Sequence, residues 1–234
     1  MLATADGDGS VYLWNTVSAE FIATPADPGS GGVFGVAFSP DGKVLGTADA
    51  VGRVYLWNTA TGRRMATLAD SGGVGTNVNA VAFSPDDKVL AAADADGRAY
   101  LWNAVAGQQI GTLTDPGTAG VTGVAFSPDG KFLATADGDG RAYLWNAVTD
   151  RRIATLADPG SAGVYAVAFS PDGKVLATAD QNRSAYLWNT VTDRRIATVI
   201  DPGSGGVRGL AFSPDGTMLA TADRNGSAYL RSIG

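Results

Sequence analysis

The 234-residue sequence contains no histidine and no cysteine, and it has only one glutamate and four lysines. Without histidine and cysteine the chain can form no Ser-His-Asp triad, no cysteine nucleophile, no disulfide and no ordinary structural zinc site. The acidic residues are 22 aspartates and the single Glu20, and this excess of Asp over Glu suits turn-rich β structure better than helix. We therefore expect a protein that is not an enzyme, with no catalytic residue, no cofactor and no metal.

Long apolar runs are also absent. No stretch of 18 apolar residues predicts a membrane-spanning helix, and no basic segment followed by an apolar core begins the chain. We therefore expect a cytoplasmic protein with no membrane partner. Apolar residues make up 45% and charged residues 17% of the sequence, which is typical of a globular protein with ample core. A single domain over residues 1–234 is expected.

A repeat of 43 residues organises the chain. The segments 121–163 and 164–206 are identical at 32 of 43 positions. The phrase AFSPDG or AFSPDD returns at spacings of 45, 43, 43 and 43 residues, with its Phe at Phe38, Phe83, Phe126, Phe169 and Phe212. A fixed period in this range marks a repeat architecture in which each unit buries its apolar face against its neighbours.

Each repeat predicts four short strands. In the repeat from residue 121, V-x-x-V-A-F runs into an S-P-D-G turn, and L-A-T-A-D forms a second strand before the turn G-D-G. The third strand places Tyr143 and Trp145 on one face and Leu144 on the other, because successive side chains of a strand alternate. A fourth strand is expected from Ile153 to Leu156. The fold class is therefore all-β.

The phrases V-A-F-S-P-D-G, L-A-T and Y-L-W-N resemble the WD-repeat β-propeller family, of a bacterial type with highly similar blades, over nearly the whole chain. The resemblance implies four-stranded antiparallel blades around a central channel. Such repeats usually join a histidine to a Ser or Thr, a turn Asp and the Trp, and this chain has no histidine. We expect that network to be incomplete in every blade, each lost hydrogen bond costing roughly 0.5 to 1.5 kcal/mol. Burial of four tryptophans would then supply most of the stability: Trp57, Trp102, Trp145 and Trp188.

The sequence begins and ends within a repeat. Residues 1–32 hold three strands of a partial blade, full repeats start near residues 33, 78, 121 and 164, and the partial repeat 207–234 carries Arg231 in place of Trp. The resulting 22 strands allow a five-blade ring in which 207–212 completes the first blade and two strands are left over, or a six-blade ring with two three-stranded blades. The unmatched strands also fit a fragment of a longer protein, or a homo-oligomer that pairs its terminal strands.

Two motifs have both a chemical and a structural interpretation. The D-x-D-G pairs, such as Asp137 and Asp139, resemble part of a calcium loop but lack its remaining ligands, so we favour hairpin turns. The regularly placed tryptophans could stack on sugars, but their identical place in each repeat favours core packing.

Candidate binding residues are those at which the similar repeats differ. After the first Val of each repeat the sequence varies, and it varies again at the turn between the second and third strands. The resemblance places both positions on one loop face near the channel mouth. The selected residues are Phe34, Asn79, Tyr165, Gln181, Arg208 and Arg224. The alternative explanation for them is drift at exposed sites.

Charge gives a further expectation for this loop face. Under the resembled arrangement it collects six arginines and 14 aspartates, a net charge of −8, whereas the opposite face has +2. Such a field favours a basic partner and disfavours nucleic acid. The aspartates are Asp6, Asp8, Asp27, Asp49, Asp70, Asp94, Asp96, Asp115, Asp137, Asp139, Asp158, Asp180, Asp201 and Asp223.

These features predict a non-enzymatic scaffold or sensor module that presents an acidic loop face to a protein or peptide. The resemblance adds that bacterial propellers of this kind are often attached to signalling kinases or ATPases. The alternative is a glycan-binding lectin with one weak site per blade. Ligand stoichiometry separates the two, since a scaffold has one asymmetric site.

Overall fold

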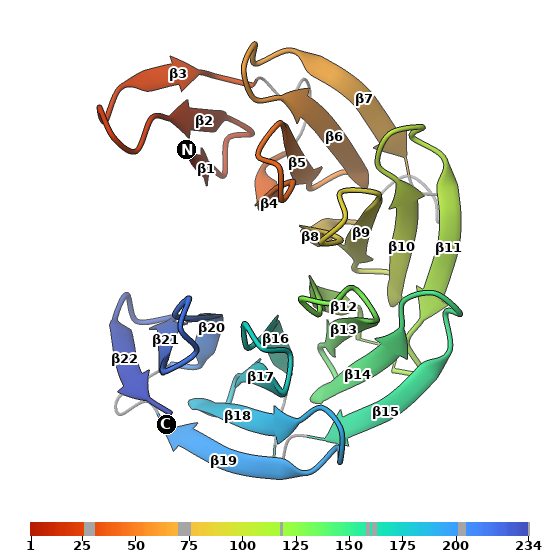
Figure 1. Ribbon diagram of the computed structural model, residues 1–234, viewed down its shortest axis with the longest axis vertical. Helices are drawn as coiled ribbons and strands as arrows, with labels where there is room; N and C mark the ends of the chain where they lie inside the picture. Colours follow the sequence, from red (N-terminus) through yellow and green to blue (C-terminus); the bar gives the residue numbers. More distant parts are fainter. Residues whose placement is uncertain are drawn as a thin grey trace. The chain divides into compact units, whose positions relative to one another are not determined.

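The computed structural model describes residues 1–25, 31–69, 76–117, 119–157, 160, 163–200 and 205–233. The chain divides into two compact units, unit 1 (Met1–Thr114) and unit 2 (Asp115–Gly234). Figure 1 labels the strands of both. In these described ranges, no helix has the length and apolar character needed to cross a membrane.

Unit 1 contains three antiparallel sheets, called blades 1 to 3 (Figure 1). Blade 1 has the strand order β1-β2-β3, blade 2 the order β4-β5-β6-β7 and blade 3 the order β8-β9-β10-β11. The strands are β1 (Leu2–Ala5), β2 (Val11–Trp14), β3 (Phe21–Ala23), β4 (Val33–Phe38), β5 (Val44–Asp49), β6 (Arg53–Asn58), β7 (Arg64–Ala69), β8 (Val78–Phe83), β9 (Val89–Asp94), β10 (Arg98–Asn103) and β11 (Gln109–Thr114).

Unit 2 contains blades 4 to 6, with the orders β12-β13-β14-β15, β16-β17-β18-β19 and β20-β21-β22. The strands are β12 (Val121–Phe126), β13 (Phe132–Asp137), β14 (Arg141–Asn146), β15 (Arg152–Ala157), β16 (Val164–Phe169), β17 (Val175–Asp180), β18 (Ser184–Asn189), β19 (Arg195–Ile200), β20 (Val207–Phe212), β21 (Met218–Asp223) and β22 (Ala228–Ser232).

Over the described ranges the all-β prediction and the count of 22 strands are confirmed, and these strands form six blades. The five-blade alternative is wrong, because β20 pairs with β21 and stays in the last sheet. Blades 1 and 6 are the two three-stranded sheets of the six-blade alternative.

The S-P-D-G-K turn closes the first hairpin of blade 2 with side-chain hydrogen bonds. The Ser39 hydroxyl donates to Asp41 Oδ1 at 2.8 Å, and the backbone N–H of Lys43 donates to the same oxygen at 3.0 Å. Lys43 Nζ lies 2.9 Å from Asp41 Oδ2. The hydrogen bond from Lys43 lowers the pKa of Asp41 to about 2. Serine and aspartate at these positions therefore fix the hairpin by capturing backbone groups of their own turn.

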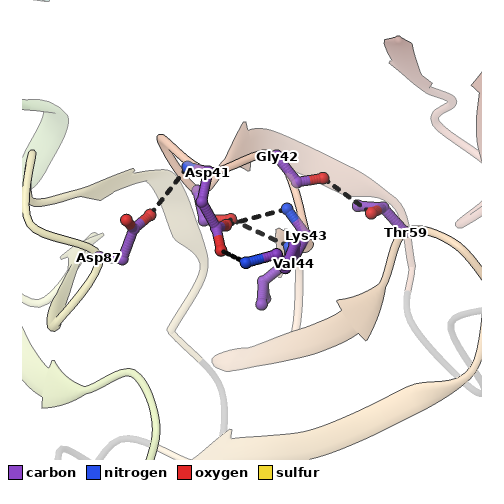
Figure 2. Close-up of polar contacts among 7 residues, drawn as sticks. Asp41, Gly42, Lys43, Val44, Thr59 and Asp87 are labelled. Atoms are coloured by element: carbon purple, nitrogen blue, oxygen red, sulfur yellow. Dashed lines mark hydrogen bonds and ion pairs between the residues drawn. The ribbon is translucent and has the colours of Figure 1, made fainter.

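Blade 3 departs from this turn at one residue. Asp87 stands where the other four turns have glycine, and it keeps the left-handed backbone with φ 62°. Its carboxylate Oδ1 accepts a hydrogen bond from the backbone N–H of Asp41 at 3.1 Å, so it joins blade 3 to blade 2 (Figure 2). The strain of a non-glycine residue is offset by a contact between blades.

We expect Asp87→Ala to destabilise unit 1 by about 1 kcal/mol more than Asp87→Gly. Both variants lose the hydrogen bond to Asp41, but only alanine keeps a Cβ in the left-handed region. Urea denaturation of the two variants measures the difference. Equal stabilities would show that the backbone conformation of residue 87 carries no cost.

Tyrosine and tryptophan of the third strands of blades 2, 3 and 5 pack in the core between blades. In unit 1, Tyr100 and Trp102 of blade 3 pack in one cluster with Val54 and Leu56 of blade 2. In unit 2, Trp188 belongs to the equivalent cluster between blades 4 and 5. The side chains of all four core tryptophans are 4–6% exposed, which confirms the core interpretation and leaves them unable to stack on a sugar: Trp57, Trp102, Trp145 and Trp188.

Threonine in the second strand binds the indole nitrogen where both residues are present. Trp145 Nε1–H donates to Thr135 Oγ1 at 3.0 Å, and the same bond occurs in blades 1, 2 and 5. Blade 3 lacks it, because Ala92 stands in the threonine position. In blade 6, Arg231 replaces Trp, and the buried Thr221 hydroxyl has no hydrogen-bond partner within the described ranges. The repeats therefore differ in whether the hydrogen bond between threonine and tryptophan is formed.

Candidate functional site

The variable residue after the first Val of each repeat occupies a β-bulge. In all five first strands the pairing register shifts between the Val and the residue two positions later. A bulge leaves one residue unpaired and re-aims its side chain, and bulges are frequent beside functional sites. The bulged residues are Phe34, Asn79, Thr122, Tyr165 and Arg208.

Burial separates these bulged residues from the framework that holds them. The preceding valines are at most 6% exposed, whereas Phe34 and Arg208 are exposed and Asn79 and Tyr165 are half-buried. In unit 1 a Cβ on Gly35 would lie 2.9 Å from Ala80 Cα, so glycine allows the strands after Phe34 and Asn79 to approach closely. A closely packed backbone position thus carries a side chain that differs from repeat to repeat.

In unit 2 the bulges of neighbouring blades contact each other. Arg208 Cζ lies 3.9 Å from the centroid of the Tyr165 ring, within the range of a cation–π interaction. The Thr122 hydroxyl donates to the carbonyl oxygen of Val164 at 2.5 Å. The structure thereby brings together two of the predicted site residues, Tyr165 and Arg208, which are 43 positions apart in the sequence.

Gln181 and Arg224 lie at the turns of the same two blades. The backbone N–H of Gln181 donates to Gly163 O at 3.0 Å, and that of Arg224 donates to Gly206 O at 3.0 Å. Each bond ties the turn to the residue that lies two positions before a bulge, and both side chains are exposed. We call the group Tyr165, Gln181, Arg208 and Arg224 the blade 5–6 loop patch.

Unit 1 presents Phe34 beside carboxylates. The backbone carbonyl of Asp6 accepts a hydrogen bond from Val33 N–H at 3.2 Å, which places blade 1's turn next to the bulge at Phe34. The Phe34 side chain is 52% exposed, and Asp6 and Asp8 are also exposed. Hydrogen bonds from Ser10 lower the pKa of Asp8, so its carboxylate is charged at neutral pH. We call Asp6, Asp8 and Phe34 the blade 1–2 loop patch.

Burial reduces the charge that the aspartates of the loop face offer to a partner. Within the described ranges, six of them are at most 8% exposed: Asp49, Asp94, Asp115, Asp137, Asp180 and Asp223. Asp96 and Asp139 are partly buried and form ion pairs with Arg98 and Arg141. The remaining Asp27, Asp70, Asp158 and Asp201 lie outside the described residues. The accessible carboxylates of the described loop face are therefore those of Asp6 and Asp8.

The D-x-D-G pairs form turns. Asp137 Oδ1 accepts the backbone N–H of Asp139 at 2.8 Å, and the pairs in blades 1 and 3 make the same bond. Across the ranges given above, no group of three or more carboxylates is arranged to hold a metal ion. The carboxylate oxygens stabilise the backbone of the turn, as the turn interpretation predicts.

In blade 4 a buried carboxylate takes the role that the resemblance gives to histidine. Both Asp115 oxygens lie 3.1 Å from Thr135 Oγ1, which in turn accepts the N–H of Trp145. Burial raises the pKa of Asp115 to about 7, and nearby Asp137 and Asp139 add to the rise. Sequence reasoning missed this partner, although an aspartate begins the corresponding loop of every repeat.

Antiparallel sheets built from a 43-residue repeat are blades of the β-propeller class, and the repeats vary at the first-strand bulges and at the turns between the second and third strands. The sequence matches the WD40 family model, described as WD domain, G-beta repeat, over residues 21–58, 63–103, 107–146, 151–189 and 194–231. The chain therefore belongs to the WD40 family. Each matched segment joins the last strand of one blade to three strands of the next. A comparison with curated proteins gave no significant match.

Membership of this family has a general functional meaning. WD40 domains are typically protein-interaction scaffolds and are generally not catalytic. The bulged residues and loop patches are the positions at which the repeats of this chain differ from one another.

Proposed function

We propose that the chain is a scaffold or sensor module that binds a protein or peptide partner through its two loop patches. The observation that carries this proposal is the bulge found at the same place in every first strand. It holds a side chain of changing chemistry beside a buried valine, so recognition can vary while the fold does not.

The blade 1–2 loop patch supports a basic partner segment. The face of an exposed aromatic ring attracts a cation, and the Asp6 and Asp8 carboxylates can pair with Lys or Arg. The net charge of −6 would also speed association with a cationic partner and disfavour nucleic acid. In the blade 5–6 loop patch, Tyr165 and Gln181 would add aromatic and hydrogen-bonding contacts.

Phe34→Ala is expected to weaken binding of a basic peptide at least tenfold. The probe is an immobilised set of 15-residue peptides whose net charge runs from −4 to +4, and we expect the bound peptides to be rich in Lys and Arg. A hot-spot residue near the centre of an interface typically costs about 2 kcal/mol or more when it is truncated, which is more than tenfold in affinity. Val17→Ala is the matched control, because Val17 is 95% exposed in the turn between β2 and β3, at the other end of the strands.

Salt and stoichiometry complete the test. Binding to the basic peptides should weaken as salt rises from 50 to 300 mM, since exposed charges are screened. The proposal is contradicted if the affinity does not change with salt, if polyanions bind more tightly than basic peptides, or if Phe34→Ala binds as tightly as the wild type. Saturation near one ligand per chain supports a scaffold, whereas saturation near one per blade supports the lectin alternative.

A further inference from the structure

A cavity of about 230 Å³ lies between blades 5 and 6 in unit 2, and none of its lining residues belongs to the blade 5–6 loop patch. Its apolar wall comes from Val175, Leu187, Ile196, Phe212 and Ile233. The side chains of the two S-P-D-G hairpin turns, which close the opposite end of the blades, complete it. This volume is larger than the roughly 150 Å³ cavity known to bind benzene, and smaller than the roughly 300–1,000 Å³ typical of drug-sized ligands. It suits a single aromatic ring system.

The repeat itself suggests why the cavity exists. Between blades 4 and 5 the residues equivalent to Leu187 and Phe212 are Leu144 and Phe169, and they belong to the apolar cluster that contains Trp188. Between blades 5 and 6 the position of this tryptophan is taken by Arg231. The register is the same, since Trp188 pairs with a leucine of β17 and Arg231 with the corresponding leucine of β21.

Arg231 does not replace the missing indole. Its Cζ lies 5.8 Å from the centroid of the Tyr229 ring, on its own strand, and the cavity wall does not include it. The apolar cluster between blades 5 and 6 accordingly contains Leu187, Leu219 and Phe212 but no third-strand aromatic. A hollow also lies at the equivalent turns between blades 4 and 5, but it is lined by turn residues and Phe132 and does not reach Leu144 or Phe169, which pack with Trp188. The missing indole therefore accounts for the depth of the cavity between blades 5 and 6, where Leu187 and Phe212 are reached.

The rim of the cavity is negatively charged. Asp172 and Asp215 both line it, and hydrogen bonds from serine lower the pKa of each, to about 2 for Asp215. Asp172 is paired with Lys174 at 3.3 Å. Blade 6 carries Thr217 in the place of that lysine, so the charge of Asp215 has no neighbouring ammonium on its own turn.

We propose that this cavity binds an aromatic ring that carries an adjacent cationic amine. The ring fills the apolar space that tryptophan fills in the other blades, and the amine pairs with the Asp215 carboxylate. A free aromatic amine and a Trp beside Lys in a partner peptide offer the same chemistry. The cavity shares no residue with either loop patch, so this proposal is independent of the function proposed above.

The test uses tryptamine, indole and indole-3-propionate as probes, with binding followed by the NMR shifts of the Ile196 and Ile233 methyl groups. We expect tryptamine to bind at least fivefold more tightly than indole, and indole-3-propionate to bind more weakly than either. Asp215→Asn should remove the advantage of tryptamine over indole. Acetyl-Lys-Trp-Lys-amide binding more tightly than tryptamine assigns the site to a protein partner, and the reverse order assigns it to a small amine.

Two variants close the cavity from different sides. Arg231→Trp should restore the missing indole, raise the thermal midpoint and weaken tryptamine binding at least tenfold. Ile196→Trp blocks the same space from a side chain that is 55% exposed, so it should leave the fold intact. The proposal is overturned if no probe gives saturable shifts up to 5 mM, if binding ignores the charge of the probe, or if Ile196→Trp leaves tryptamine binding unchanged.

Discussion

Replacing Trp145 with alanine is expected to lower the free energy of unfolding by about 3 to 5 kcal/mol. The indole is only 5% exposed, and its N–H is hydrogen-bonded to Thr135 in the middle of the sheet. Alanine would leave a large cavity between packed strands, together with a hydroxyl that has lost its donor. Urea denaturation followed by circular dichroism measures the loss, with the slope of the transition compared with that of the wild type to detect any change in cooperativity.

The repeat offers a matched pair of variants that separates packing from hydrogen bonding. Trp145→Phe removes the N–H that Thr135 accepts, whereas Trp102→Phe removes an N–H in blade 3, where Ala92 stands in the threonine position. Both substitutions take away the same atoms from side chains of nearly equal exposure. Trp145→Phe should therefore cost about 1 kcal/mol more than Trp102→Phe. Equal losses would mean that the hydrogen bond contributes nothing to stability.

The regular part of the fold follows from the sequence because alternation and turn chemistry act locally. The fourth strand predicted at residues 153–156 is observed as β15, Arg152–Ala157. Tyr143 and Trp145 pair with alternate residues of β13, as the alternation of side chains along a strand requires. The number of blades could not be decided in advance. Whether the strand at 207–212 joins the first or the last sheet depends on pairing between distant segments, which no local pattern encodes.

The candidate site was only partly predictable for the same reason. Variation between repeats selected Tyr165 and Arg208, but their stacking depends on how neighbouring blades approach each other. The bulge that holds these residues could not be detected from the repeat length, because the first strands of both blades contain the same bulge and the repeats therefore have the same length. The charge of the loop face was overestimated because residues such as Asp137 turn their carboxylates toward the backbone and become buried. Counting residues gives formal charge, whereas exposure decides how much of it a partner meets.

Asp115 should make the stability of the protein fall as pH rises from about 4 to about 7. Burial raises the pKa of its carboxyl group from 3.8 to about 7, so in this window the folded state binds a proton that the unfolded state has lost. This contribution is fully present below pH 3.8 and is lost through pH 7. A change of this size in pKa corresponds to at most about 4 kcal/mol. Urea denaturation at intervals between pH 4 and pH 8 follows the decline.

Asp115→Asn is expected to flatten this profile and to make the variant more stable than the wild type at pH 8. The amide can still accept the Thr135 hydroxyl hydrogen but acquires no charge, so the desolvation cost of ionisation disappears. Asp172→Asn is the control: Asp172 is exposed and hydrogen bonds from Ser170 lower its pKa, so it titrates below this window and should leave the slope unchanged. Parallel profiles for wild type and Asp115→Asn would show that Asp115 ionises normally in the folded protein. The hydrogen-bonded chain from Trp145 through Thr135 would then end in a charged acceptor, stabilised by solvent or by Arg152, whose positive charge lowers the pKa of Asp115.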